Sequence, residues 1–354
     1  MKLVLVALAL LVVVATALPF LRFDQWWIRV LDFPRGQIAI TGIILVTVYL
    51  FFWNPHRIYE SVILGLLVLA VGYQVVKMFP YTVLMPKQVM NAESYSDEAN
   101  LKLLVANVLI DNRESEAFLE VVRDYDPDVI LTVETDDWWE EALRPLEDTY
   151  PHTLKNPLNN TYGMLVYSRL EIINASIRFI LKDSIPSMHM QVVLPSDDRV
   201  SMHFVHPDPP NPKYATETTE RDAELLIVGR EVEKHDKPTI IAGDFNDVAW
   251  SYTTTLFQKA SGLLDPRIGR GMYSTYNARI PLLRWPLDHV FHSDHFKLVR
   301  MEKGPAWGSD HFPVFIELSL EPEAEAEQEE PDTNHAEAEK VEEKIVDGKQ
   351  RAKE

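Results

Sequence analysis

The chain has 354 residues, a formal net charge of −19 and no cysteine, which excludes disulfide bonds, thiol nucleophiles and cysteine-ligated metal sites. Its acidity weighs against a dedicated nuclease, because an acidic protein repels a phosphate backbone unless a basic strip or a metal ion offsets the charge. Composition divides the chain into an apolar segment at 1–80, a linker at 81–99, a globular domain at 100–320 and a charged tail at 321–354.

Three uncharged apolar runs occupy the first segment, at 3–21, 36–53 and 61–76. Their lengths are close to the ~20 residues that a helix needs to cross a bilayer. Trp26 and Trp53 lie near their ends, where aromatic rings favour the membrane interface. The sequence therefore predicts about three transmembrane helices in a multi-pass protein of the cell (inner) membrane. The string Ala15-Thr16-Ala17 leaves open a cleaved signal peptide instead of a first span.

The side of the membrane follows from the basic residues in the loops. Arg22, Arg29 and Arg35 lie in the first loop, and Lys77 and Lys87 follow the third run on the same side. Lysine and arginine are enriched in cytoplasmic loops, so this count places the large domain in the cytoplasm.

Residues 101–134 have the pattern of a β-α-β unit. An apolar strand at 101–105 ends near Asn107, a helix carries Phe118 and Val122 on its apolar face, and a strand at 129–133 ends at Glu134. Polar side chains directly after buried strands lie at the rim of a sheet. We therefore expect Asn107 and Glu134 at a common edge.

The remaining elements indicate a mixed domain. Strands are expected at 163–168, 190–194, 200–205, 238–242, 288–292 and 314–318, and helices at 216–234 and 253–264. The hairpin of the second and third of these strands ends at His206. Such a mixture predicts an α/β fold with sheets packed face to face and helices outside.

Two polar clusters interrupt this pattern. The run ending at Ala242 stops at Gly243-Asp244-Phe245-Asn246, and Gly308-Ser309-Asp310-His311 precedes the last strand. Asp244 and Asn246 are two residues apart, so in an extended segment they point the same way. Two such rims in one domain indicate a hydrolytic site built from strand ends.

In chain order, a series of polar sites over about 100–320 resembles the endonuclease/exonuclease/phosphatase superfamily, in particular a membrane-anchored bacterial branch. The sites that carry the resemblance are Asn107, Glu134, Tyr162-Gly163, Ser168-Arg169, His206, Gly243-Asp244-Phe245-Asn246, Asp288 and Ser309-Asp310-His311. The resemblance implies a four-layer α/β/β/α sandwich that catalyses metal-assisted hydrolysis of a phosphoester.

The resemblance also implies a metal site. Asn107, Glu134 and Asp310 would surround the ion, and oxygen ligands of this kind suit Mg²⁺ (or Mn²⁺). Some members carry an acid two residues after the position that matches Asn107, where this chain has Leu109. This departure implies a single ion whose remaining ligands are waters.

Catalytic roles follow from the same resemblance. Asp244 would activate the attacking water, which Asn246 holds. His311, oriented by Asp288, and His206 would contact the scissile phosphate. A histidine held by an acid keeps one orientation and can donate hydrogen bonds or move protons near neutral pH.

The short linker bears on the substrate. About 20 extended residues reach only roughly 70 Å, so the domain works near the bilayer, which favours a lipid phosphate or pyrophosphate. Bacterial members with three amino-terminal spans are associated with undecaprenyl pyrophosphate outside the cytoplasm. The resemblance therefore favours an extracytoplasmic domain, against the count of basic residues.

Two alternative functions stay open. A metal-dependent nuclease would need a basic groove, for which the sequence offers only scattered arginines at 267, 270, 279 and 284. A non-catalytic membrane scaffold should have lost Asp244, Glu134 or His311, and all three are present. The tail, with 13 acids and 5 bases, is expected to be disordered or a transient helix.

Overall fold

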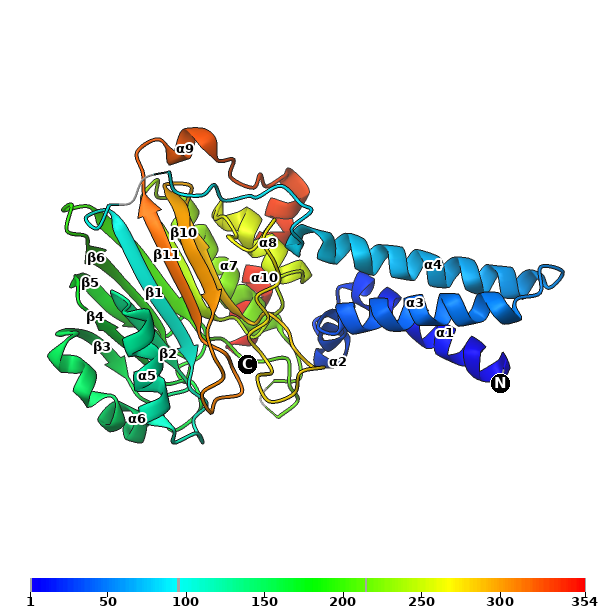
Figure 1. Ribbon diagram of the computed structural model, residues 1–354, viewed down its shortest axis with the longest axis horizontal. Helices are drawn as coiled ribbons and strands as arrows, with labels where there is room; N and C mark the ends of the chain where they lie inside the picture. Colours follow the sequence, from blue (N-terminus) through cyan, green and yellow to red (C-terminus); the bar gives the residue numbers. More distant parts are fainter. Residues whose placement is uncertain (1, 94–95, 214, 354) are drawn as a thin grey trace.

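The computed structural model describes residues 2–93, 96–213 and 215–353. A narrow bundle of amino-terminal helices projects from one side of a broad α/β domain (Figure 1). The bundle consists of α1 (Lys2–Ala17), α3 (Arg35–Phe52) and α4 (Ile58–Met78), with the short turns η1 (Leu18–Leu21), α2 (Trp26–Arg29), η2 (Val30–Asp32) and η3 (Phe79–Tyr81).

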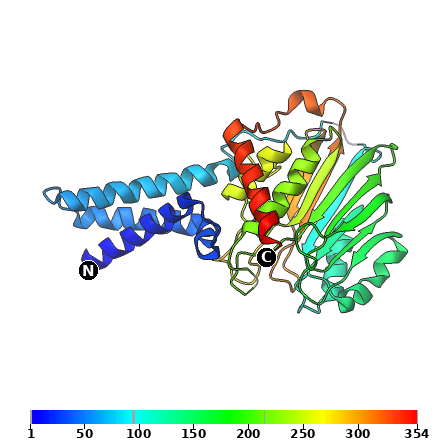
Figure 2. The same ribbon diagram turned by 180° about the vertical axis from the view of Figure 1, so that it is seen from behind.

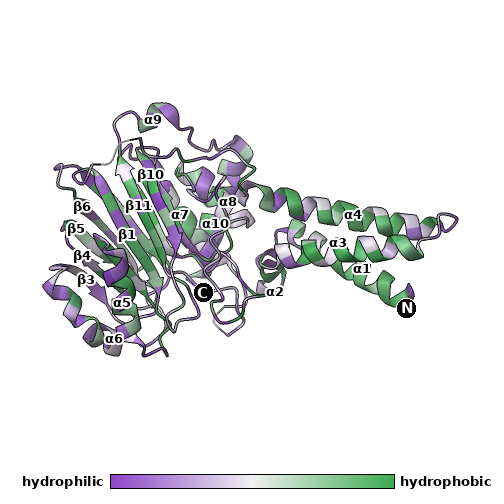
Figure 3. Cartoon of the chain, viewed as in Figure 1, coloured by the Kyte–Doolittle hydropathy of each residue, from purple (hydrophilic) through white to green (hydrophobic). Residues whose placement is uncertain are grey.

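All three long helices, extended by their terminal turns, are long and apolar enough to cross a membrane. Their surface is apolar as well, with Leu3, Phe51 and Leu69 at least 70% exposed, and the bundle is mostly hydrophobic along its length (Figure 3). Gly42 lets α3 approach α4 closely, since a Cβ there would lie 2.5 Å from Val71. Small residues at such contacts are typical of membrane helix pairs.

Two sheets form the centre of the domain. The first has the strand order β10-β11-β1-β2-β4-β3, and the second β5-β6-β7-β8-β9. Their bounds are β1 Asn100–Asn107, β2 Val129–Val133, β3 His152–Asn156, β4 Met164–Ser168, β5 Glu171–Arg178, β6 Ser187–Val193, β7 Arg199–Val205, β8 Thr239–Asp244, β9 Asp288–His292, β10 Phe296–Lys303 and β11 Val314–Leu320. Among these described strands, β1–β2 and β7–β8 pair in parallel and the other neighbours are antiparallel.

Alternating side chains of the strands face a shared core between the sheets, which includes Leu103, Leu131, Phe204 and Ile240. The other face of the first sheet is covered by α5 (Ser115–Tyr125) and α6 (Asp137–Ala142), with η4 (Arg144–Asp148) following. The other face of the second sheet is covered by α7 (Thr219–Glu233) and α8 (Tyr252–Ser261). The four-layer sandwich expected from the sequence is confirmed.

Strands β3, β5 and β10 were not expected from the sequence, and each lies at the edge of its sheet. Edge strands keep many side chains in solvent, and the residues of β5 are exposed or half-buried along its whole length. Charged and polar residues on such strands also hinder pairing with other chains. The apolar alternation that reveals an interior strand is therefore weak in these three.

The composition predicts a tail that is disordered or a transient helix, and in the structure the tail is helical and packed. It forms α9 (Ala324–Glu327) and α10 (His335–Arg351), and α10 begins at a capping box between Asn334 and Glu337. Figure 2 shows α10 lying across α7. Val341 and Ile345 pack into the core of that layer, and Gly348 lets the helices meet, since a Cβ there would lie 2.2 Å from Ala223.

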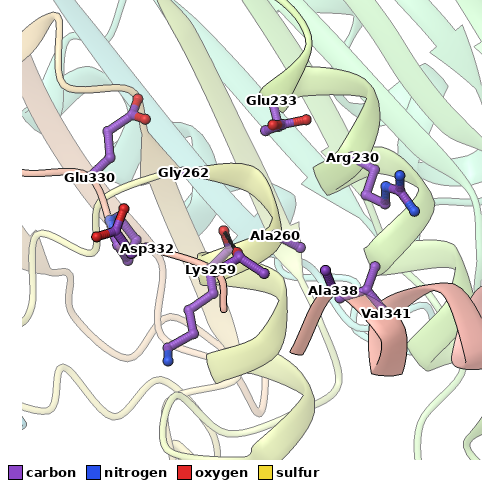
Figure 4. Close-up of a pocket in the computed structure, with 11 residues that line it drawn as sticks. Arg230, Glu233, Lys259, Ala260, Gly262, Glu330, Asp332, Ala338 and Val341 are labelled. Atoms are coloured by element: carbon purple, nitrogen blue, oxygen red, sulfur yellow. Dashed lines mark hydrogen bonds between the residues drawn. The ribbon is translucent and has the colours of Figure 1, made fainter. Parts of the chain in front are cut away.

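A polar cavity of about 380 Å³ lies under the start of the tail helix. Figure 4 shows the side chains around it, with Arg230 and Lys259 among the acids Glu233, Glu330 and Asp332. Its mixed charges come from α7, α8 and the tail, so the tail completes the outer helical layer and does not extend freely from it.

The linker is packed as well. Ala92 donates a backbone hydrogen bond to Leu298, and the side chain of Val89 is fully buried. The domain is seated directly on the end of the bundle: Trp250 donates to the carbonyl of Asp32 at 2.7 Å, and Tyr81 donates to the carbonyl of Ala249 at 2.7 Å. The linker is therefore folded against the domain in this structure and does not extend over the roughly 70 Å that its length would allow.

Candidate active site

Polar side chains from both sheets meet at one edge of the sandwich, where β1 and β2 end and where β7 and β8 end. Asn107, the last residue of β1, donates through Nδ2 to Glu134 Oε1 at 2.8 Å and to Asp244 Oδ2 at 3.0 Å. One amide thus joins the first sheet to the second. In Figure 1 this edge is the lower one, on the side of α2.

The backbone turns sharply at these strand ends. Glu134 has φ of 61° and Asn246 has φ of 51°, a left-handed conformation that most residues avoid and that clusters at functional sites. Gly243 has φ of 142°, and a Cβ there would lie 2.0 Å from the carbonyl oxygen of Val205. Glycine therefore permits the close approach of β8 to β7 that places Asp244 beside His206.

His311 lies between two carboxylates. Its Nδ1 is 2.8 Å from Asp288 Oδ2, and its Nε2 is 3.6 Å from Asp244 Oδ2. Burial disfavours the charged imidazole, but Asp288 and Asp244 outweigh this effect and raise the pKa of His311 to about 10. The ring is therefore an imidazolium near neutral pH.

Ser309 fixes the backbone of His311. Its hydroxyl donates to the carbonyl of Asn107 at 2.7 Å and accepts the amide of His311 at 3.0 Å. The turn that carries His311 is thereby attached to the end of β1.

Glu134 belongs to a cluster of carboxylates. Burial, followed by the charges of Asp244 and Asp310, raises its pKa to about 7. Such grouped oxygen donors fit a divalent cation, which would relieve their mutual repulsion. Asn107 braces this cluster in the structure, because its Oδ1 accepts the amide of Leu109 at 3.0 Å while its Nδ2 faces the carboxylates.

Asp244, Asp288 and His311 also lie close enough together to surround an ion. The contacts of His311 Nδ1 with Asp288 and of His311 Nε2 with Asp244 also make these three residues a charged triad.

Asp244 and His206 face each other across β8 and β7. His206 Nε2 is 4.0 Å from Asp244 Oδ2, and burial lowers the pKa of His206 although Asp244 opposes this effect. Burial and the charge of Asp288 raise the pKa of Asp244. Asn246 ties the two segments together, since its amide nitrogen Nδ2 donates to the carbonyl of Pro207 and its backbone to Asp244.

The structure thus brings the predicted residues to one edge: Asn107, Glu134, His206, Asp244, Asn246, Asp288 and His311 are joined by short contacts, and Asp310 acts on Glu134 and His311 through its charge. Their catalytic and metal-binding roles remain predictions.

Sequence reasoning missed Arg221 as a positioning residue. Its buried guanidinium donates to the carbonyl of Asn246 at 3.0 Å and contacts Asp247 at 3.2 Å. Asp247, three residues after Asp244, offered a signal, because a buried carboxylate needs a cation.

Tyr276 was also missed, and its ring lies 4.9 Å from that of His311. It comes from the irregular loop 262–287, where periodicity carries no information.

A sequence model of the Endonuclease/Exonuclease/phosphatase family matches residues 104–311. A comparison with curated proteins gives no match.

Several solved structures have a similar fold. An endonuclease/exonuclease/phosphatase from Beutenbergia cavernae is 19% identical, with 63% of this chain and 72% of that chain covered and a TM-score of 0.50. The human Nocturnin catalytic domain with a bound sulfate anion is 15% identical, with 63% and 94% covered and a TM-score of 0.51. A humanized D. rerio TDP2 is 13% identical, with 62% and 99% covered and a TM-score of 0.51. At these identities the likeness shows the fold alone.

Proposed function

Because this chain belongs to the endonuclease/exonuclease/phosphatase family, we propose that it is a membrane-anchored, divalent-metal-dependent phosphoesterase. The single observation that carries the proposal is the edge at which Asn107 joins Glu134 to Asp244 while His311 lies between Asp244 and Asp288. This arrangement combines a base, a cation-binding cluster and an imidazolium within reach of one phosphate.

Glu134 and Asp310 would hold the cation, with Asn107 joining them once its amide turns its oxygen inward. Mg²⁺ or Mn²⁺ at this position would neutralise phosphoryl charge and polarise a phosphoryl oxygen.

The protein's own groups then have separate roles. Asp244 accepts the proton of the attacking water, and its raised pKa makes it a better base than an exposed carboxylate. Asn246 holds the Asp244 carboxylate through its backbone amide at 2.8 Å. The His311 imidazolium donates to the charge that develops on the phosphate, and Asp288 keeps its ring oriented.

His206 is neutral and donates or accepts a hydrogen bond according to its tautomer. Its Nδ1 is buried and has no hydrogen-bond partner among the described residues. Its Nε2, 4.0 Å from Asp244 Oδ2, is the nitrogen that would contact a phosphoryl or ester oxygen.

We propose a lipid-linked phosphate or pyrophosphate as the substrate, such as undecaprenyl pyrophosphate, and the cell membrane as the location, with the domain outside the cytoplasm. Apolar helices next to the catalytic edge support this substrate. Two of the four arginines that a nuclease would use are engaged elsewhere: Arg267 is fully buried against Asp265, and Arg270 donates to the carbonyl of Val89.

The full chain, purified in detergent, tests the proposal. It should hydrolyse 4-nitrophenyl phosphate or bis(4-nitrophenyl) phosphate with Mg²⁺ or Mn²⁺ and stop with chelator. Asp244→Asn should lower kcat by about 10²–10⁴-fold, the range for a lost general base.

Asp236→Asn is the matched control, since Asp236 is exposed and precedes β8 at the opposite end of that strand. Turnover that is indifferent to chelator would refute the metal role. An Asp244→Asn enzyme as active as the control would refute the role of Asp244.

A further inference from the structure

A largely apolar cavity of about 520 Å³ lies between the bundle and the catalytic domain. Ala39 and Ile40 of α3, Val75 of α4, and Leu282 and Trp285 of the loop 262–287 are among its walls. Its volume is typical of small-molecule sites, which measure roughly 300–1,000 Å³.

Two aromatic rings pack between this cavity and the active site. Trp285 in the cavity wall stacks on Tyr276 with 6.0 Å between ring centroids, and Tyr276 lies 4.9 Å from the ring of His311. Isolated β-bridges join Tyr276 to both of these residues. The floor of the cavity and the catalytic histidine therefore belong to one packed unit.

The positively charged side chain of Arg284 lies in the cavity wall and connects to the site through the backbone. Arg284 is the one charged side chain among the described residues that line the cavity. It donates to the carbonyl of Ala278 at 3.4 Å, and the amide of Ala278 donates to the carbonyl of Asp310 at 2.7 Å. An anionic group passing from the cavity to Asp310 and His311 would meet this guanidinium.

The loop beside the cavity presents apolar side chains at the end of the bundle. Ile280, Leu282 and Leu283 are 47%, 81% and 42% exposed. Gln37 of α3 donates to the carbonyl of Leu282 at 2.8 Å, which holds the loop against the helix. Exposed apolar groups next to membrane helices are stabilised when lipid covers them.

We infer that the cavity holds the hydrocarbon chain of a lipid phosphate whose phosphate group lies at Glu134 and His311. The inference rests on the proposed phosphoesterase activity and assigns α3 and α4 to the substrate site. A chain from the bilayer enters beside Leu282 and lies against Trp285, whose ring packs on Tyr276 next to His311. Arg284 pairs with the phosphate as it enters.

The test uses the full chain reconstituted in phosphatidylcholine vesicles and a pair of substrates with one head group. Hexadecyl and ethyl phosphate, or hexadecyl and ethyl 4-nitrophenyl phosphate, are chosen according to the ester class that the wild-type enzyme cleaves. The wild-type kcat/KM should favour the hexadecyl substrate. Leu282→Ser should lower that preference about three- to tenfold, because part of a leucine side chain's burial is lost.

Leu84→Ser is the matched control. Leu84 is 77% exposed at the same end of the bundle but lies outside the cavity walls, so its substitution should leave the preference unchanged. Ala39→Phe fills the cavity from α3 and should also reduce the preference, with Ile43→Phe, one turn further along the same helix and outside the cavity walls, as its control.

The outcomes separate the two proposals. Hydrolysis of the ethyl substrate with no preference for the hexadecyl chain would overturn the cavity assignment and leave the phosphoesterase proposal standing. A preference that persists in both Leu282→Ser and Ala39→Phe would also overturn it. Failure of the wild-type enzyme to cleave either ester class, with the short or the long chain and any divalent metal, would overturn the proposed function, and the inference with it.

Discussion

Lys344→Met tests how much the packed tail helix α10 contributes to the stability of the protein. The Lys344 ammonium is nearly fully buried and lies 2.8 Å from Asp222 of α7 and 3.0 Å from Asp24 of the loop after α1. Methionine keeps most of the side-chain volume and removes the charge. The two carboxylates then lose a shared cation.

Removing one partner of a buried ion pair costs about 3–5 kcal/mol. Each carboxylate keeps an arginine here, since Arg221 contacts Asp222 and Arg29 contacts Asp24. We therefore expect a loss near the lower limit, about 3 kcal/mol. For a domain of this size such a loss lowers Tm by roughly 6–12 °C.

The effect should depend on pH. The cations around Asp222 hold its pKa below the usual range despite burial, and the pairing carboxylates raise the pKa of Lys344 against burial. A carboxylate with a lowered pKa stabilises the fold above its unfolded pKa, and this contribution is lost as the pH falls through the folded pKa. An amine with a raised pKa contributes below its unfolded pKa. The penalty should therefore be full between about pH 4 and pH 10 and shrink in stronger acid.

Thermal unfolding of the full chain in detergent, followed by circular dichroism between pH 3 and pH 8, measures this effect. Lys340→Met is the control. Lys340 lies four residues before Lys344 but pairs with Glu343 of the same helix, so its loss leaves the ion pair between Lys344 and α7 in place. If Lys344→Met unfolded within about 2 °C of that control at pH 7, the buried ion pairs would not hold the tail, since about 3 kcal/mol predicts a larger shift.

Three further changes test the site and the topology. Ser309→Ala removes the hydroxyl that joins Asn107 to His311. It should lower kcat about tenfold, the rate equivalent of one lost buried hydrogen bond, and leave KM close to that of the wild type. Steady-state kinetics measures both constants, and an unchanged kcat would contradict this role of Ser309. Glu134→Gln should weaken Mg²⁺ activation by at least about 10–100-fold, measured as the midpoint of a metal titration, and an unshifted midpoint would remove Glu134 from the metal site. An alkaline phosphatase reporter fused to the carboxyl terminus should be active if the domain lies outside the cytoplasm, whereas an inactive fusion would support the count of basic residues.

The interior of the fold could be predicted from the sequence. Strands β1, β2, β4 and β8 lie inside their sheets, and their continuous apolar runs identify them. The edge strands β3, β5 and β10 could not be found in this way because some of their side chains lie in solvent, whereas the edge strand β9 is buried along its whole length and was predicted.

The residues of the candidate site also fall into a group that the sequence predicts and a group that it does not. Residues that follow interior strands, such as Glu134 and Asp244, were predictable from their position in the chain. Arg221 and Tyr276 reach the site from a helix and an irregular loop through tertiary packing, which local patterns do not record.

The packing of the tail helix could not be predicted for a related reason. Its many acids suggested a solvated segment, but Val341, Ile345 and Gly348 form one narrow face, and Lys344 on that face finds acids from α7 and the first loop. An apolar face of so few residues does not change the average composition of the tail enough to be noticed.

The direct contact between the domain and the helix bundle has a consequence for how the protein would meet its substrate. Trp250, a few residues after Asp244, donates to Asp32, and the ring of Trp285 meets that of Phe33 with centroids 5.8 Å apart. If the bundle spans a bilayer as proposed, the residues of the candidate site stand at a fixed height and tilt above it, which a flexible linker would not give. The enzyme would then meet a lipid phosphate by diffusion within the plane of the membrane, and a bilayer too thick or too thin for the bundle would shift that phosphate away from the site.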